Sequence, residues 1–221
     1  MERHIEQELE NLKQVFLRMA DLVENSFQQA VDALLSEDDR LAEQVINGDQ
    51  LINAIEVEID ESIISILALQ HPLASDLRLI VATLKVNNDL ERIGDHAVNI
   101  AESVRTLRTI PGSEPLMEIP AMARTVKEML TKALHSFIHL DADLAADVLA
   151  SDDTIDELNR KNTHAMISLS KSDSHAIDGA MELVRISRNL ERVADLTTNI
   201  AEEVIFVTQA RDVRHPGNRD R

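Results

Sequence analysis

The sequence predicts an all-α protein, a tandem repeat of two three-helix bundles with six long antiparallel helices. Apolar residues recur at intervals of three and four along almost the whole chain, which is the period of an amphipathic helix. Glycine and proline number only five each among 221 residues, too few for the frequent turns of a β-sandwich. Residues 90–104 and 190–204 are identical at nine of fifteen positions, which indicates that the two halves are copies of one domain.

The first half contains three helical segments separated by turn signals. The apolar face of the first segment runs over residues 5–34, and the polar residues 36–39 that follow can cap the next helix. The second segment covers residues 41–69 and stops before Pro72, because the residue preceding a proline avoids the helical region. The third covers residues 74–107, and its apolar spacings alternate between four and three, as in the seam of a helical bundle.

A proline-rich stretch divides the chain. Residues 110–120 contain three of the five prolines, which is typical of a linker. Three further helices are expected near residues 121–140, 141–171 and 175–210. The last residues have no apolar period, so we expect them to fray. The predicted organisation is a first bundle over 1–110, a linker over 111–120, a second bundle over 121–210 and a disordered tail over 211–221.

Composition excludes several classes of protein. The absence of cysteine excludes a disulfide framework, a thiolate metal site and a cysteine nucleophile. With 40 acidic and 22 basic residues the net charge is −18, which repels nucleic acid and anionic lipid. The longest apolar stretch, residues 63–69, is far shorter than the roughly 20 residues that span a bilayer. The charged N-terminus has no apolar signal region, so we expect a cytoplasmic protein without nucleic-acid binding or membrane insertion.

Two equivalent rows of polar residues stand out. Glu91, Asp95 and Asn99 lie at i, i+4 and i+8 of the third helix, and are expected opposite its hydrophobic seam on the outer face. The same residue types recur in the sixth helix as Glu191, Asp195 and Asn199. Acidic residues one turn apart repel each other unless something neutralises them. Such a row in an acidic protein can also be no more than a solvated helix face.

Recurrence favours a functional interpretation of the two rows. Asp89, expected on the same outer face, is replaced by Asn189 in the second copy, whereas the rows recur intact. The neighbouring Arg92 and Arg192 recur as well.

The rows offer oxygen ligands only, a set that suits Mg²⁺, Mn²⁺ or iron and that zinc could also enter. One helix supplies two or three ligands, so a metal cluster needs others from water, phosphate or a second helix. Asp49 and Asn53 on the second helix, and Asp152 and Asp156 on the fifth, are further candidates or ordinary flanking polarity. The predicted metal ligands are Glu91, Asp95, Glu191 and Asp195, followed by Asn99, Asn199, Asp49 and Asp152.

No catalytic motif accompanies these rows. The five scattered glycines form no phosphate-binding loop or nucleophile elbow, and His135 and His139 lack the intervening Glu of a zinc protease motif. The Glu-x-x-His motif of di-iron bundles is absent. We therefore predict no catalytic residues and no enzyme, with a phosphatase that activates water on clustered metal as the alternative.

Three segments resemble the PhoU family of phosphate-response regulators. They are QHPLASDLR at 70–78, LKVNNDLERIGDHAVNIAE at 84–102 and NLERVADLTTNIAEEV at 189–204. The resemblance implies two three-helix bundles, no enzymatic activity, and a multinuclear metal site in each bundle. Transferred to this sequence, the metal pairs are Glu91 with Asp95 and Glu191 with Asp195, and the metal is iron, manganese, magnesium or zinc.

The resemblance also implies cytoplasmic partners. It predicts negative regulation of the phosphate regulon through the ATPase subunit of a phosphate ABC transporter and a sensor histidine kinase, and we expect a homodimer. The second repeat has SKSDSHAIDG at 170–179 in place of the QHPLASDLR turn. This asymmetry allows two unequal metal sites and fits a partner that touches one bundle only. An accessory subunit of a different phosphate permease is a second alternative.

Overall fold

The computed structural model describes residues 2–70, 72–110 and 118–211, and this part of the chain is helical without any β-strand. The α-helices are α1 (Glu2–Ser36), α2 (Asp39–Leu69), α3 (Ala74–Leu107), α4 (Glu118–His139), α5 (Ala142–Leu149), α6 (Asp152–Ser172) and α7 (Ile177–Gln209). A short 3₁₀ turn, η1 (Ser174–Ala176), precedes α7. The predicted all-α class is confirmed.

The two halves use the same turn after their first helix. Glu37 and Leu140 have positive φ angles of 53°, which ends α1 and α4 in the left-handed conformation common after helices. Asp38 and Asp141 follow, and each carboxylate accepts hydrogen bonds from the backbone N–H groups two and three residues ahead. These caps satisfy donors that the first turns of α2 and α5 would otherwise leave unpaired.

Two predicted boundaries differ in the structure. The helix predicted over 141–171 is split into α5 and α6 at Ala150–Ser151. Helix α4 begins at Glu118, inside the predicted linker, because a proline such as Pro120 is tolerated in a first turn, where its missing N–H has no helical partner. The rest of that linker, 111–117, and the predicted tail beyond Arg211 lie outside the described residues.

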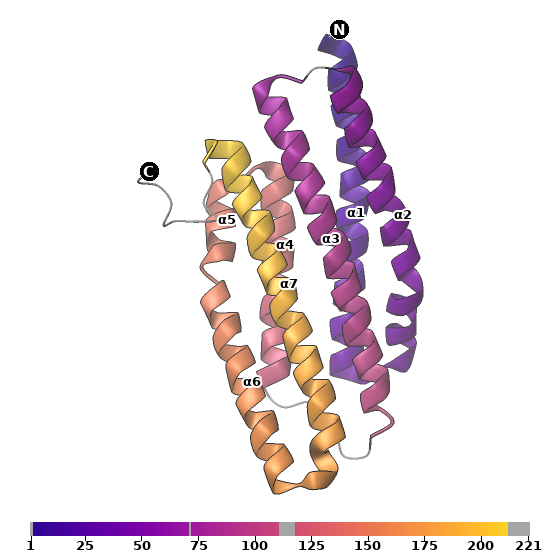
Figure 1. Ribbon diagram of the computed structural model, residues 1–221, viewed down its shortest axis with the longest axis vertical. Coiled ribbons are helices and arrows are strands. Elements are labelled where there is room, and N and C mark those ends of the chain that lie inside the picture. Colours follow the sequence, from indigo (N-terminus) through magenta and orange to yellow (C-terminus); the bar gives the residue numbers. More distant parts are fainter. Residues whose placement is uncertain (1, 71, 111–117, 212–221) are drawn as a thin grey trace.

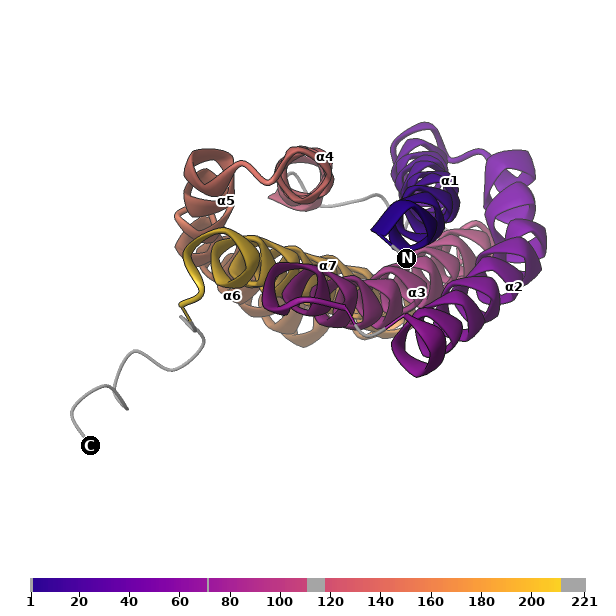
Figure 2. The same cartoon turned by 90° about the horizontal axis from the view of Figure 1, so that it is seen from above.

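The two bundles lie side by side, α1 to α3 in one and α4 to α7 in the other (Figure 1). Helices α3 and α7 pack against each other in the middle, as the view from above shows (Figure 2). Aliphatic and aromatic side chains fill each bundle; Phe27, Ile59 and Ile93 in the first and Met122 and Val193 in the second are fully buried. Each such side chain stabilises the fold by roughly 1.5–3 kcal/mol through apolar burial.

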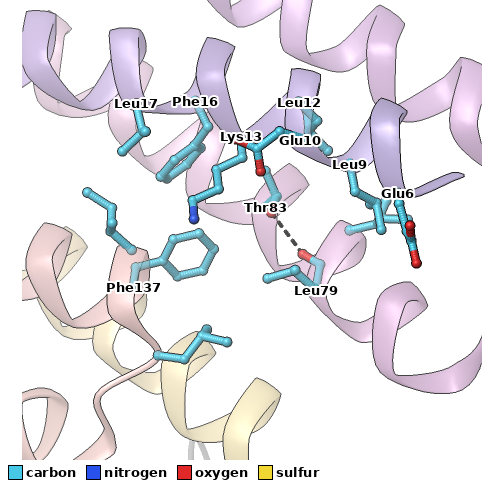
Figure 3. A pocket seen from close by; sticks show the side chains of 13 residues that line it. Glu6, Leu9, Glu10, Leu12, Lys13, Phe16, Leu17, Leu79, Thr83 and Phe137 are labelled. Carbon is cyan, nitrogen blue, oxygen red and sulfur yellow. Dashed lines mark hydrogen bonds between the residues drawn. The ribbon is translucent and has the colours of Figure 1, made fainter. Parts of the chain in front are cut away.

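The bundles also meet through α1 and α4. The rings of Phe16 and Phe137 lie 5.0 Å apart between centroids, at an interplanar angle of 43°. Beside them is an apolar cavity of about 340 Å³ walled by α1, α3 and α4. Figure 3 shows Lys13 reaching along α1 toward the Phe137 ring. No described helix is apolar over a length that could cross a membrane.

Candidate metal centres

The first acidic cluster joins α2 and α3 and consists of Asp49, Glu56, Glu91 and Asp95. Burial raises the pKa of Glu91, and the nearby charges of Asp95, Glu56 and then Asp49 raise it further. Burial also raises the pKa of Glu56, with Asp60 and Asp95 adding to the shift. These mutual effects mean that carboxylates from two helices repel one another across a short distance.

Asp49 has an oxygen without a partner. Its Oδ2 accepts a hydrogen bond from Asn53 Nδ2 at 3.0 Å, whereas its Oδ1 is buried and has no hydrogen-bond donor among the described residues. Burial raises the pKa of this carboxyl, Asn53 opposes the shift, and Asp95 adds to it. A buried acceptor without a donor costs about 1–3 kcal/mol. A hard cation would supply what this oxygen lacks, so the residues fit an oxygen-ligated metal.

Gly94 allows the close approach of α2 at this point. A Cβ atom on Gly94 would lie 3.1 Å from Ile52 Cδ1 and 3.6 Å from Asp49 Oδ1. The missing side chain therefore makes room chiefly for Ile52, while Asp49 lies within ordinary contact distance of the same turn of α3.

The second acidic cluster joins α6 and α7 and consists of Asp152, Asp156, Glu191 and Asp195. Partial burial of its carboxyl group raises the pKa of Asp195, and the charges of Glu191 and Asp156 raise it further. Burial likewise raises the pKa of Asp152, followed by Asp156 and Asp195. Asp49 and Asp152 are 103 positions apart, so three of the four acidic positions correspond between the two clusters: 49 with 152, 91 with 191 and 95 with 195.

Among the described residues, no three Asp, Glu or His side chains surround one point closely enough to hold a metal ion as they stand. The clusters are therefore open groups of carboxylates and not closed coordination shells.

Only part of each row lies on the predicted outer face. Glu91 and Glu191 are half-buried, while Asp95 and Asp195 are exposed. The prediction placed the rows opposite the hydrophobic seam, but Glu91 in fact lies close enough to α2 for the charges of Glu56 and Asp49 to act on it.

Comparison with known proteins agrees with this architecture. The model of the family described as "PhoU domain" matches the chain twice, over residues 16–104 and 119–204. The chain belongs to the PhoU family. The resemblance found in the sequence is thereby confirmed.

Relatives within the PhoU family cover nearly the whole chain. A phosphate-specific transport system accessory protein PhoU homolog of Aquifex aeolicus is 39% identical over 208 residues, 94% of each chain. The homolog from Pseudomonas aeruginosa is 39% identical over 212 residues, 95% of this chain and 87% of its own.

Solved PhoU structures have the same fold. The crystal structure of PhoU from Pseudomonas aeruginosa matches with a TM-score of 0.89 at 36% identity, covering 93% of this chain and 99% of that one. The phosphate transport system regulatory protein PhoU from Streptococcus pneumoniae matches with a TM-score of 0.86 at 30% identity, covering 95% and 99%.

In this PhoU-family chain, two of the weaker metal candidates have other partners. Asn99 Oδ1 accepts a hydrogen bond from Arg185 Nη2 at 3.0 Å, and the Asn199 side chain hydrogen-bonds Asp89. Both asparagines therefore contact the other repeat, in the seam between α3 and α7. Glu56, by contrast, was missed, since its counterpart 103 positions on is Asn159 and recurrence between repeats was the criterion used.

Asp89 is also not on an outer face. It is only 9% exposed, and burial raises its pKa to about 6 despite the opposing effects of Arg92 and Asn199. A helix at the edge of an isolated bundle has a solvent face, but in this tandem fold that face of α3 packs against α7.

Proposed function

We propose that this chain is a metal-binding accessory protein of a phosphate transport system that represses phosphate-scavenging genes when phosphate is plentiful. The observation that carries the proposal is similarity over nearly the full length of both chains to proteins described as phosphate-specific transport system accessory proteins. A solved relative is described as a phosphate transport system regulatory protein, which supports regulation in place of catalysis.

The two acidic clusters are the proposed metal sites. Asp49, Glu91 and Asp95 would hold metal in the first bundle, and Asp152, Glu191 and Asp195 in the second. Carboxylate oxygens favour iron, manganese or magnesium, and several ions in each cluster would offset its charge. Bound metal would supply positive charge there. The chain's own contribution is to hold α2 near α3 and α6 near α7, so that both sites lie on preformed helical faces.

The proposed partners are the ATPase subunit of a phosphate ABC transporter and a sensor histidine kinase, contacted in the cytoplasm, with the chain itself a homodimer. An acidic helical surface suits recognition by another protein better than chemistry on a small molecule. The chain would change the activity of its partners by binding them, with no reaction of its own.

A deletion strain tests the regulatory role. Loss of the protein should derepress a phosphate-scavenging reporter in phosphate-rich medium, and the wild-type gene should restore repression. Restoration by the Glu91→Ala/Asp95→Ala variant should be weaker than by Asp21→Ala/Glu43→Ala, which removes two exposed acids outside the clusters. Normal repression in the deletion strain, together with phosphate release from esters by metal-loaded protein, would favour the phosphatase alternative instead.

A further inference from the structure

The seam between α3 and α7 is electrostatically unequal at its two ends. The helices run antiparallel, because Lys85 Nζ contacts Glu203 Oε1 at 2.8 Å while Arg185 Nη2 contacts Glu102 Oε2 at 2.8 Å. The cleft at one end is lined by five acids and one lysine: Glu56, Asp60, Asp89, Glu202, Glu203 and Lys85. The pocket at the other end is lined by Arg185, Arg188 and Arg192 with Asn99, Asn189 and two apolar residues, and by no carboxylate.

We propose that this arginine pocket, defined by Arg185, Arg188, Arg192 and Asn189, binds a tetrahedral oxyanion of the phosphate type. Its volume of about 290 Å³ suits a small anion or a phosphorylated side chain. The proposal concerns a site distinct from the acidic clusters and does not depend on metal.

Two of the arginines have their donors available. Arg188 and Arg192 are exposed and make no ion pair or hydrogen bond within the described part of the chain. Guanidinium groups bind phosphate oxygens through paired, charge-assisted hydrogen bonds. In a chain of net charge −18, two arginines four residues apart on one helix face, neither of them in an ion pair among the described residues, are a local reversal of sign.

Arg185 has a different part in the pocket. It contacts Glu102 Oε2 at 2.8 Å and Asn99 Oδ1 at 3.0 Å, so its charge is largely compensated and its side chain is held in place. Arg185 therefore shapes the pocket wall. Arg188 and Arg192 provide the remaining positive charge, although the charge of Arg192 also acts on Asp195 and opposes the rise in its pKa.

The floor of the pocket is neutral and fixed. Asn189 is 8% exposed; its Oδ1 lies 2.9 Å from His96 Nδ1, and its Nδ2 donates to the backbone oxygen of Arg185 at 2.8 Å. The equivalent residue at the other end of the seam is Asp89, whose carboxylate would repel an anion. The exchange of Asp for Asn, together with Arg188 where the first repeat has Asn88, makes only this end suitable for an oxyanion.

Acidic residues beside the pocket set a limit on its affinity. Asp95 and Asp195 line the adjoining cleft together with Arg92 and Arg192. Their charge opposes the anion, so we expect specific but moderate binding. The oxyanion could come from free inorganic phosphate or from a phosphorylated side chain on a partner protein, since both present the same oxygens.

Isothermal titration of chelator-treated protein tests the pocket, with inorganic phosphate in one arm and a phosphoserine peptide in the other. Arg188→Gln/Arg192→Gln should weaken binding by about tenfold or more, the loss expected for charged hydrogen bonds. The matched control Arg105→Gln/Arg160→Gln removes two exposed arginines elsewhere and should bind as wild type. Asn189→Asp should also weaken binding, and circular dichroism should show unchanged helicity in every variant.

The outcomes separate the sources of the anion. Binding of inorganic phosphate that needs the arginines identifies the free anion, and binding of the peptide alone identifies a modified partner; both support the pocket. No saturable binding of either probe, or wild-type affinity in the arginine variant, overturns it. Phosphate binding that needs added metal and is lost in Glu91→Ala/Asp95→Ala but not in the arginine variant also overturns it, and leaves the proposed function standing.

Discussion

At the scale of single residues, Asp49 is the residue whose surroundings most favour the proposed metal site. Its Oδ1 is buried without a donor, and its neighbours on α3 are acidic. A protein under selection for stability alone would be better served by an apolar residue at this position. The carboxylate is consistent with a role in binding that is paid for in stability.

Asp49→Ala should therefore stabilise the chelator-treated protein while reducing its metal content. Removing a carboxylate that has one buried, unsatisfied oxygen gains about 1 kcal/mol, which raises Tm by roughly 2–4 °C in a chain of this size. Thermal unfolding followed by circular dichroism measures the first effect, and elemental analysis of untagged protein the second. The exposed Glu43→Ala should change neither; a lower Tm for Asp49→Ala without metal would contradict the prediction.

At the scale of elements, the sequence was sufficient wherever a helix ends through a local signal. Pro72 and the capping Asp38 define the boundaries of α2, and the prediction agrees with the structure there. The break at Ala150–Ser151 was missed because the apolar period continues through Val148 and Ile155, although Ser151 and the two acids after it are residue types common at helix N-termini. The Ser151 hydroxyl instead donates to the backbone oxygen of Asp147.

At the candidate site, too, the sequence predicted what depends on a local or repeated pattern and not what depends on long-range packing. The repeat in the sequence was enough to find Glu91, Asp95 and their counterparts, because duplication itself preserved them. It could not place Asp89 or Asn99, since their surroundings come from the packing of one repeat on the other. Interactions between elements distant in sequence leave no periodic pattern.

The helix break between α5 and α6 makes the two acidic clusters unequal, and we expect two classes of metal affinity. Asp152 is in the first turn of α6, where the positive end of the helix dipole already stabilises a carboxylate, whereas Asp49 is in the interior of α2. The two clusters have equal numbers of acids, since the first has Glu56 where the second has Asn159, and the second has Asp156 where the first has Asn53. The first cluster should therefore bind the same divalent metal more tightly.

Titration of chelator-treated protein with Mn²⁺ measures this difference. Glu91→Ala/Asp95→Ala should remove the tighter class, and Glu191→Ala/Asp195→Ala the weaker one, with helicity retained because the bundles have apolar cores of their own. This prediction would be contradicted by a single affinity class in the wild type, or by loss of the tighter class in the Glu191→Ala/Asp195→Ala variant.

At the scale of the whole molecule, polar groups are buried where the halves meet. Lys85, Asp89 and Glu203 from the two repeats lie together in the seam, and His96 contacts Asn189 nearby. Association of the halves therefore depends on ionisation as well as on apolar contact.

The raised pKa of Asp89 predicts how stability depends on pH. Its folded value of about 6 lies above the ordinary value of 3.8, so the folded state binds the proton more tightly than the unfolded state. This contribution to stability is present at low pH and is lost as the pH rises toward about 6, on the order of 2–3 kcal/mol. Four other groups act on the pKa of this carboxyl. Arg92, Asn199 and Lys85 lower it, and Glu203 raises it.

The Asp89→Asn substitution should make the free energy of unfolding depend less on pH. Urea unfolding of chelator-treated wild type and variant at about pH 4.5 and about pH 7 gives the comparison, and the variant should gain most at the higher pH. The variant reproduces the residue found at the equivalent position 189. Parallel pH dependences for the two proteins would show that Asp89 ionises in the folded state as it does in the unfolded chain.

The antiparallel seam also has a consequence for how such a fold can change. In a symmetric dimer of single repeats, every substitution appears at both ends of the interface at once. With both repeats in one chain, a mutation alters one end alone, as the pairs 88/188, 89/189 and 103/203 illustrate. A single chain with two repeats is therefore free of the symmetry that a dimer imposes on its interface, and the two ends of this seam have linings of opposite charge.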